Sequence, residues 1–248
     1  IEYLESYRKL NTYDLSTQRV VLSRVLKDLK ENVYCYNKEL KYVERLDFFD
    51  NFIREKIIKK LNTFSLESKL MKRLITGDSV EINGKKYKTL KEIFNNKKIK
   101  NFATNRLSPV HGDLTLENIL FNIVENDYKL IDMDGAKLLD SYYLDLGKLS
   151  QSILARYSEW NNADIQVKYK NDGFHCNPDW FNLRPEDGEF LNYVWPFEEE
   201  ILDKAIFYMG TYFIRFTPFR MKKGINHGLF ALMMAVVWLN KLKLGDTK

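Results

Sequence analysis

A short apolar hairpin bounded by polar residues is the feature that most constrains how this chain folds. Residues 119–121 and 128–131 have the length and composition of buried strands, and residues 125–127 (Glu-Asn-Asp) form a turn between them. Such a hairpin places Asn118 just before one strand and Asp132 just after the other. Two polar side chains that are distant in sequence are therefore expected to meet at one end of the hairpin.

The loop ahead of the hairpin adds a third polar group, Asp113, within the run from Pro109 to Leu120. A carboxylate at this place can accept the proton of an attacking hydroxyl, while Asn118 and Asp132 can hold the Mg²⁺ that bridges nucleotide phosphates. Mg²⁺ prefers hard oxygen ligands and keeps several waters, so one carboxylate and one amide oxygen are sufficient. The pattern predicts a phosphoryl-transfer site, where catalysis is mostly positioning and charge neutralisation.

These residues also have a purely structural explanation. Asp and Asn beside strands are common turn formers and helix caps. A single H-x-D-x-x-x-x-N match also arises by chance in long chains. The match from His111 to Asn118 is joined, however, to an apolar strand and to the Ile131-Asp132 pair at hairpin distance. This combination favours a kinase-type site.

Four segments between about residues 105 and 150 carry a family likeness: His111-Gly112-Asp113-Leu114, Asn118-Ile119-Leu120, Leu130-Ile131-Asp132 and Tyr143-Leu144-Asp145-Leu146-Gly147-Lys148-Leu149. Together they resemble the aminoglycoside phosphotransferase and choline kinase group of small-molecule kinases. The resemblance implies that Asp113 is the catalytic base and that Asn118 and Asp132 are the metal ligands. It also implies that His111 is a scaffold residue of the catalytic loop and that Asp145 supports this loop from behind.

Two departures from the protein-kinase pattern limit the class of molecule that could accept the phosphoryl group. Gly112 and Thr115 stand where Ser/Thr protein kinases usually carry Arg and Lys. The missing Arg argues against control by a phosphorylated activation loop, and the missing Lys argues against a peptide hydroxyl as acceptor. We therefore expect transfer of the γ-phosphoryl group of ATP or GTP to a small molecule such as a sugar, an amino alcohol or an aminoglycoside-like compound. Residues 145–152 and 213–220 also resemble kinase-like proteins of bacterial surface-polysaccharide pathways.

The first residues, Ile1 to Ser6, resemble the hinge at which such kinases bind adenine through backbone groups. Glu2, Tyr3 and Leu4 are therefore expected to contact the nucleotide. A kinase amino-terminal lobe, with a Gly-rich turn and a phosphate-binding Lys, would precede this hinge. No such glycine cluster occurs, and the first glycine is Gly77. The expectation is a carboxy-terminal lobe whose amino-terminal lobe is missing, through truncation rather than because the natural protein works without one.

Composition limits the remaining function classes. The chain has 248 residues, enough for one or two domains, and its 16 Phe, 15 Tyr and 4 Trp suit a core of large side chains with a ligand cleft. Its net charge of +5 comes from lysines spread over predicted helices, which disfavours nucleic acid as a partner.

Cys35 and Cys176 fit neither a disulfide scaffold nor a metal motif, so a cytoplasmic setting is the default. The apolar run 229–239 is about half a membrane span and predicts a buried helix.

Hydrophobic periodicity predicts an α+β fold, mainly helical with short hairpins. Ser16 is predicted to cap a helix, and the hairpin 80–88 has an Asn-Gly tip that favours a type I′ turn. Thr89 is expected to cap a short helix ending at Phe94.

The predicted domains are a hinge-like segment (1–15) and a kinase-like lobe (16–248). The lobe comprises an inserted hairpin and helix (76–95), catalytic and metal loops (105–135) and a helical substrate side (136–248). Helices are predicted over 17–30, 38–61, 145–157, 197–213 and 225–242, with a loop over 161–188.

The resemblance places the substrate pocket between the catalytic loop and the carboxy-terminal helices. Acidic and aromatic side chains there suit a cationic amine or a polyol, although the tryptophans can equally be packing anchors and the acids solvated. Arg215 and Arg220, on either side of Pro218, suit an anionic acceptor or cap helix ends. Substrate charge and oligomeric state are left open. The candidate lining residues are Asp134, Trp160, Trp180, Glu186, Asp187, Trp195 and Glu198.

A function from another class competes with the kinase hypothesis. The chain could be a non-catalytic kinase-like module that binds a ligand or a partner. The missing glycine-rich lobe favours this alternative, whereas the presence of Asp113, Asn118 and Asp132 favours an enzyme.

Overall fold

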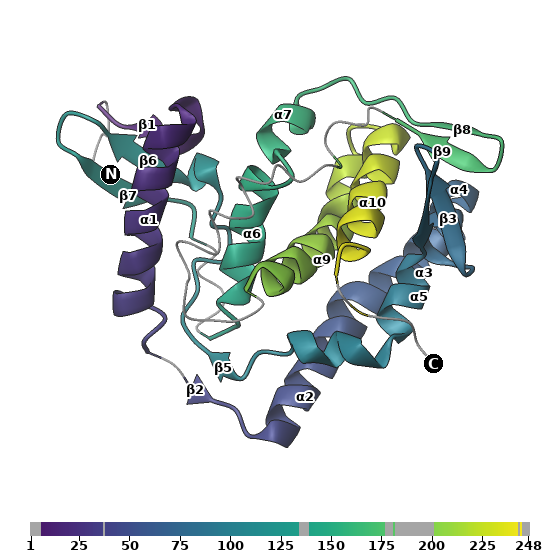
Figure 1. Cartoon of the computed structure of the whole chain (residues 1–248), viewed down its shortest axis with the longest axis horizontal. Helices are drawn as coiled ribbons and strands as arrows, with labels where there is room; N and C mark the ends of the chain where they lie inside the picture. The colour runs from purple at the N-terminus through teal and green to yellow at the C-terminus, as the bar shows by residue number, and fades with distance from the viewer. Residues whose placement is uncertain are drawn as a thin grey trace.

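The computed structural model describes residues 6–36, 38–133, 139–176, 181, 201–242 and 244. Within these residues the fold is α+β, with helices dominating three small sheets (Figure 1). The helices are η1 (Leu10–Thr12), α1 (Leu15–Asn32), α2 (Tyr42–Phe52), η2 (Ile53–Ile58), α3 (Lys59–Glu67), α4 (Lys69–Ile75), α5 (Leu90–Asn95), η3 (Lys97–Phe102), η4 (Leu116–Asn118), α6 (Tyr143–Ile153), α7 (Tyr157–Asn161), α9 (Ile201–Met221) and α10 (Ile225–Leu239). The strands are β1 (Arg8–Lys9), β2 (Lys38–Glu39), β3 (Ser79–Ile82), β4 (Lys85–Lys88), β5 (Arg106–Leu107), β6 (Ile119–Asn122), β7 (Asp127–Leu130), β8 (Lys168–Lys170) and β9 (Gly173–His175).

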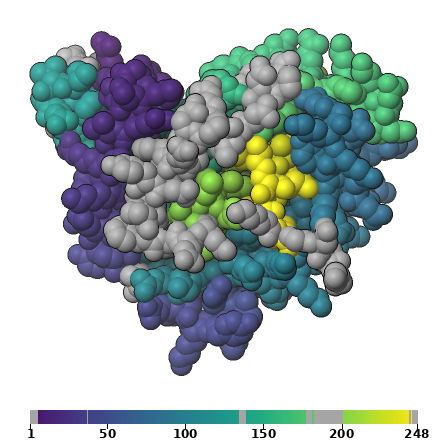
Figure 2. Space-filling model, in the orientation of Figure 1, coloured from purple at the N-terminus to yellow at the C-terminus, as the bar shows by residue number. Residues whose placement is uncertain are grey.

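The centre of the molecule is formed by α9 and α10. Helix α10 is buried continuously from Gly228 to Leu239, as expected of a helix that is apolar on all sides. This confirms the buried helix predicted from the apolar run 229–239. The two helices separate α1 and the β6–β7 hairpin on one side from the sheet of β3, β4, β8 and β9 on the other (Figure 2). None of the described helices is long and apolar enough to cross a membrane.

A glycine lets α6 approach α9 closely. A Cβ atom added at Gly147 would lie 2.7 Å from Tyr208 Cβ and 2.9 Å from Met209 N, and neither of these atoms belongs to the end of a flexible side chain. Separation of the two helices would be needed to admit it. This contact matters for function because α6 also carries residues that reach the loop ahead of the hairpin.

We expect Gly147→Ala to lower the free energy of unfolding by about 1–3 kcal/mol, because overpacking outweighs the better helix propensity of alanine. Urea denaturation measures the loss. Gly228→Ala in α10 is the matched control, since its added Cβ would meet Met221 Cγ at 2.4 Å and Met71 Cε at 3.1 Å, which belong to flexible side chains and not to the backbone. An equal or larger loss in Gly228→Ala would contradict this explanation.

The predicted hairpin is confirmed as β6 and β7, and β1 extends it to a sheet in the order β1-β6-β7. Ile119 pairs with Leu130, and Asn122 pairs with Asp127 at the turn. Asp127, predicted as part of the turn, is therefore the first strand residue. Asn126 carries the positive φ of 50° that the turn requires, which asparagine tolerates well.

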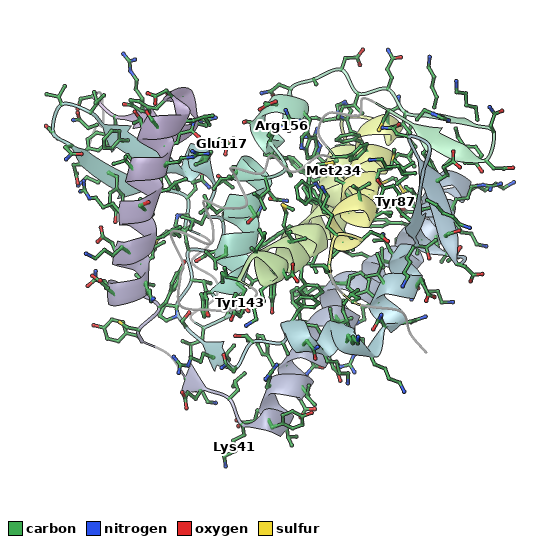
Figure 3. All side chains as sticks on the ribbon, viewed as in Figure 1. Lys41, Tyr87, Glu117, Tyr143, Arg156 and Met234 are labelled. Carbon is green, nitrogen blue, oxygen red and sulfur yellow. The ribbon has the colours of Figure 1, made fainter. Side chains whose placement is uncertain are left out.

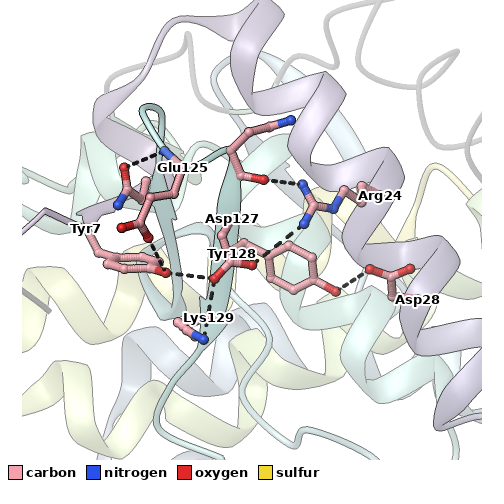
Figure 4. A network of polar contacts seen from close by, with 9 residues as sticks. Tyr7, Arg24, Asp28, Glu125, Asp127, Tyr128 and Lys129 are labelled. Atoms are coloured by element: carbon pink, nitrogen blue, oxygen red, sulfur yellow. Dashed lines mark hydrogen bonds and ion pairs between the residues drawn. The ribbon is translucent and has the colours of Figure 1, made fainter. Parts of the chain in front are cut away.

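A polar network attaches this hairpin to α1 (Figure 4). Arg24 donates to the backbone oxygen of Asn126 at 2.6 Å, and its guanidinium lies 5.2 Å from the ring centroid of Tyr128. The Tyr128 hydroxyl donates to Asp28 at 2.7 Å. Asp127 accepts from the Tyr7 hydroxyl at 2.7 Å. These contacts fix the orientation of the hairpin, and with it the positions of the residues at its two ends.

The second predicted hairpin is also confirmed. Strands β3 and β4 are joined by Asn83 and Gly84 with φ angles of 49° and 74°, as a type I′ turn requires. Thr89 caps α5 by accepting from the Glu92 amide. The predicted loop over 161–188 was wrong in its middle, because β8 and β9 form there and β9 pairs in parallel with β3. A pairing between segments so distant in sequence leaves no local pattern.

Several predicted helix boundaries were wrong for local reasons. The cap of α1 is Asp14, not Ser16, because the Asp14 carboxylate accepts from the Thr17 amide at 2.9 Å. The helix predicted over 145–157 ends at Ile153, and Arg156 then adopts a left-handed conformation that starts a new helix. The segment predicted as helix over 38–61 begins as strand β2, which pairs with β5, and continues through α2, η2 and into α3. Helix α9 extends past the predicted end at residue 213, through Pro218, to Met221, while α10 ends at Leu239 rather than at residue 242.

Candidate functional site

The loop from Val110 to Asn118 is held from behind by one buried carboxylate. Asp145, in the first turn of α6, has 0% exposure. Its two oxygens accept hydrogen bonds from the backbone amides of His111 and Gly112, each at 2.8 Å. The Tyr34 hydroxyl donates to the same carboxylate at 2.9 Å. Asp145 thus joins α6, the loop and the segment after α1, at the place where the sequence leads us to expect loop support.

The charge state of Asp145 is set by two opposed effects. Burial raises the pKa of this carboxyl above its usual value, while the donors from His111, Gly112 and Tyr34 act in the opposite direction. Burial and the neighbouring carboxylate also hold the pKa of Tyr34 well above its usual value. Tyr34 is therefore a hydrogen-bond donor at neutral pH.

Gly112 has a local reason to be glycine. Its φ is 87°, a backbone angle that residues other than glycine adopt only with strain. In this conformation its amide and that of His111 both reach the Asp145 carboxylate. Gly112, one of the two residues by which this loop departs from the protein-kinase pattern, therefore also contributes to the anchoring of the loop.

Asp113 lies at the front of this loop, and its side chain is 41% exposed. One carboxylate oxygen, Oδ1, lies 2.8 Å from Lys148 Nζ in an ion pair. The other, Oδ2, accepts from Asn118 Nδ2 at 3.1 Å, and the same nitrogen donates to the Asp113 backbone oxygen at 2.8 Å. These contacts fix the carboxylate while leaving it open to solvent, as a proton acceptor for a substrate requires.

His111 lies behind the carboxylate. It is 2% exposed, and its Nδ1 accepts from the Asp113 amide at 3.3 Å. The second ring nitrogen, Nε2, is buried and has no hydrogen-bond partner among the described residues. This burial suits the scaffold role expected of His111 and leaves it without direct access to a substrate.

The two candidate metal ligands are linked through the hairpin. The Asn118 backbone oxygen accepts from the Ile131 amide at 3.0 Å, and exposed Asp132 follows directly, with a φ of 55°. Because Asn118 Nδ2 donates to Asp113, its amide Oδ1 is the atom left for a cation. An amide oxygen and a carboxylate are hard ligands of the kind that Mg²⁺ accepts. The described residues contain no group of three His, Cys, Asp or Glu side chains suited to a metal, so phosphate and water would complete such a site.

The chain matches no protein-family model, no curated protein and no solved structure. The likeness to small-molecule kinases therefore rests on the quoted segments between residues 105 and 150. Two sets of contacts in the structure involve residues of those segments. Asp145 accepts from the loop amides, and Asn118 donates to Asp113.

Two contacts of this site were missed in the sequence. Lys148 follows Asp145 by three residues, and such residues lie on the same face of a helix, so the spacing was a usable signal. Glu117 accepts from Ser152 at 3.3 Å and from Asn11 at 3.5 Å, which ties the loop to α6 and η1. No local pattern marked Glu117, because both of its partners come from other parts of the chain.

A pocket of about 200 Å³ adjoins the loop on the α1 side. It lies against Leu116 of η4 and the end of α6, and Arg156, the residue just before α7, also lines it; Arg156 is labelled in Figure 3. Glu117, also labelled in Figure 3, is the neighbour of Leu116 that contacts Ser152. The lining residues are Asn11, Leu15, Gln18, Arg19, Leu22, Leu116, Ser152, Ile153, Arg156, Ser158 and Glu159.

Two candidates for substrate contact are core residues instead. Trp160 is 0% exposed, its indole N–H donates to the Ala155 backbone oxygen at 3.0 Å, and its ring lies 5.2 Å from that of Phe230. Arg220 is also 0% exposed; it packs over Trp160, bonds to Asn161 and lies 3.1 Å from His227 Nδ1. The packing alternative therefore holds for Trp160, and Arg220 is not placed to bind an acceptor.

The remaining candidates lie outside the described residues. The expected nucleotide contacts of the hinge-like segment and most of the expected substrate contacts stay predictions from the sequence. These residues are Glu2, Tyr3, Leu4, Asp134, Trp180, Glu186, Asp187, Trp195 and Glu198.

Proposed function

We propose that this chain transfers the γ-phosphoryl group of ATP or GTP to a hydroxyl group of a small molecule. The observation that carries the proposal is the contact between Asp113 and Asn118, together with the hairpin bond that leads from Asn118 to Asp132. Asp113 and Asn118 lie on the loop that a buried carboxylate anchors, and Asp132 follows the hairpin residue that bonds to Asn118. This is the arrangement that phosphoryl transfer to an alcohol needs.

In this proposal Asp113 accepts the proton of the attacking hydroxyl through its partly exposed carboxylate. Asn118 Oδ1 and the Asp132 carboxylate would hold Mg²⁺, which supplies charge neutralisation at the transferring phosphoryl group. Lys148 and the Asn118 amide fix the orientation of Asp113, so the base is positioned before the substrate arrives.

Removal of Asp132 tests the metal role. At a nucleotide concentration of about 100 times Kd, Mg·ATP or Mg·GTP should stabilise the full-length protein by about 2.7 kcal/mol, because only the folded state binds it. Asp132→Ala should remove most of this gain, seen as the loss of the nucleotide-dependent rise in melting temperature. Asp47→Ala, an exposed carboxylate on α2, is the matched control and should keep the rise. An unchanged calorimetric affinity in Asp132→Ala would contradict the role of Asp132.

A further inference from the structure

Two cations share one tyrosine ring beside the proposed base. Lys148 Nζ lies 4.7 Å from the Tyr212 ring centroid, and the Arg215 guanidinium carbon lies 4.6 Å from the same centroid. Tyr212 belongs to α9 and Lys148 to α6, and these two helices run side by side (Figure 1). Because Lys148 also contacts Asp113, the cluster of Lys148, Tyr212 and Arg215 begins at the base itself.

The geometry of the cluster leaves hydrogen-bond donors for a ligand. A cation over a ring face is held by the quadrupole of the ring and does not use up its N–H groups. Lys148 has three such donors, one of which faces Asp113, and Arg215 has five. Tyr212 is 6% exposed, and burial raises its pKa above the usual value, so it stays neutral between the two cations. The cluster therefore carries a net positive charge that Asp113 offsets only in part.

Arg215 has a guanidinium nitrogen that can serve a ligand. Its Nη1 is buried and has no hydrogen-bond partner among the described residues, although the side chain as a whole is half-buried. Arg220 on the same helix also packs over an aromatic ring and also has one buried nitrogen, Nε, without a partner, but its Nη1 and Nη2 bond to Asn161 and its Nη2 lies beside His227. A buried guanidinium nitrogen without a partner is costly, and an anionic ligand group would remove that cost.

We propose that the acceptor carries an acidic group, a carboxylate or a phosphate ester, which binds to Arg215 and Lys148 while the acceptor's hydroxyl lies at Asp113. The proposal rests on the phosphotransferase function and adds a substrate class to it. Arginine matches the planar geometry of both kinds of anion through paired N–H groups, and lysine adds a point charge next to the reacting hydroxyl. Cationic acceptors such as amino alcohols and aminoglycosides are disfavoured by the same two charges.

Calorimetry without any nucleotide tests the proposal, because no phosphoryl donor is then present and binding is separated from transfer. The probes are sorbitol, gluconate, sorbitol 6-phosphate and ethanolamine, which share hydroxyl groups but differ in charge. We expect gluconate or sorbitol 6-phosphate to bind more tightly than the other two, and the stronger of them identifies the kind of anion. Arg215→Gln should weaken that binding by roughly tenfold to a hundredfold, as the loss of a charge-assisted hydrogen bond predicts.

Two further variants keep the test specific. Lys222→Gln removes an exposed charge just after the end of α9 and should leave anion binding unchanged. Arg215→Lys keeps the charge without the paired donors, so its affinity should fall between those of the wild type and Arg215→Gln. Both also report on folding, since a general loss of structure would weaken binding in all three variants alike.

The outcomes separate this proposal from the function on which it rests. Equal anion affinity in Arg215→Gln, a preference for sorbitol or ethanolamine, or no anion binding at all overturns the acidic-acceptor proposal. In a transfer assay, a variant that raises KM for the nucleotide alone also overturns it, because Arg215 would then bind the donor. Arg215-dependent anion binding without any phosphotransfer by the wild type would instead refute the phosphotransferase and leave the anion site standing.

Discussion

Asp113→Asn is expected to lower the rate of phosphotransfer by about 10²- to 10⁴-fold, the usual contribution of a positioned general base. The amide cannot accept the proton of the attacking hydroxyl; its size is preserved and its oxygen can still accept from Asn118, while the ion pair with Lys148 is lost. Asp113 is also partly exposed, so the substitution should change stability little. The measurement is nucleotide consumption in the presence of an accepted substrate, with circular dichroism to follow the fold.

The matched control for this variant is Asp47→Asn, which removes one exposed carboxylate far from the loop in sequence and should retain full activity. Full activity in Asp113→Asn would refute Asp113 as the base. If instead the wild type binds Mg·ATP or Mg·GTP but transfers no phosphoryl group to any acceptor, the chain is better explained as the non-catalytic kinase-like module.

Asp145→Ala is expected to cost about 3–5 kcal/mol of the free energy of unfolding, because it leaves several buried hydrogen-bond donors without their acceptor. The backbone amides of His111 and Gly112 and the hydroxyl of Tyr34 would all lose their acceptor inside the protein. Each such buried donor costs about 1–3 kcal/mol, although the losses are not additive. Urea denaturation measures the change.

Tyr34→Phe is the graded companion of this variant. It removes one donor and leaves the carboxylate bonded to the two loop amides, so it should cost only about 1 kcal/mol. If Asp145→Ala costs no more than Tyr34→Phe, the anchoring of the loop by Asp145 is refuted.

The pH dependence of stability gives a second view of Asp145. Its pKa is raised in the folded protein, so the folded state binds the proton more readily than the unfolded state does. The Asp145 contribution to stability is therefore complete below the ordinary aspartate pKa and declines as pH rises through the folded pKa. The difference between wild type and Asp145→Asn should show this decline, and a difference that grows with pH would contradict it.

Much of the local structure could be predicted from the sequence. The hairpin of β6 and β7, the Asn-Gly turn between β3 and β4 and the buried core of α10 each follow from short-range patterns: apolar runs, turn residues and helical periodicity. The same patterns gave wrong boundaries where one side chain decided the outcome, as at the Asp14 cap of α1. They also missed β9, which exists because of its pairing with β3.

By itself, the sequence determined which groups the site has to offer: Asp113 on a glycine-containing loop, with Asn118 and Asp132 at the ends of a hairpin. Only the tertiary structure decided what surrounds them. The packing of α6 on α9 brings Lys148 to Asp113 and turns Asp145 towards the loop amides. The physical reason is that turns and short strands are set by neighbouring residues, whereas burial and ion pairing depend on segments that meet only when the core assembles.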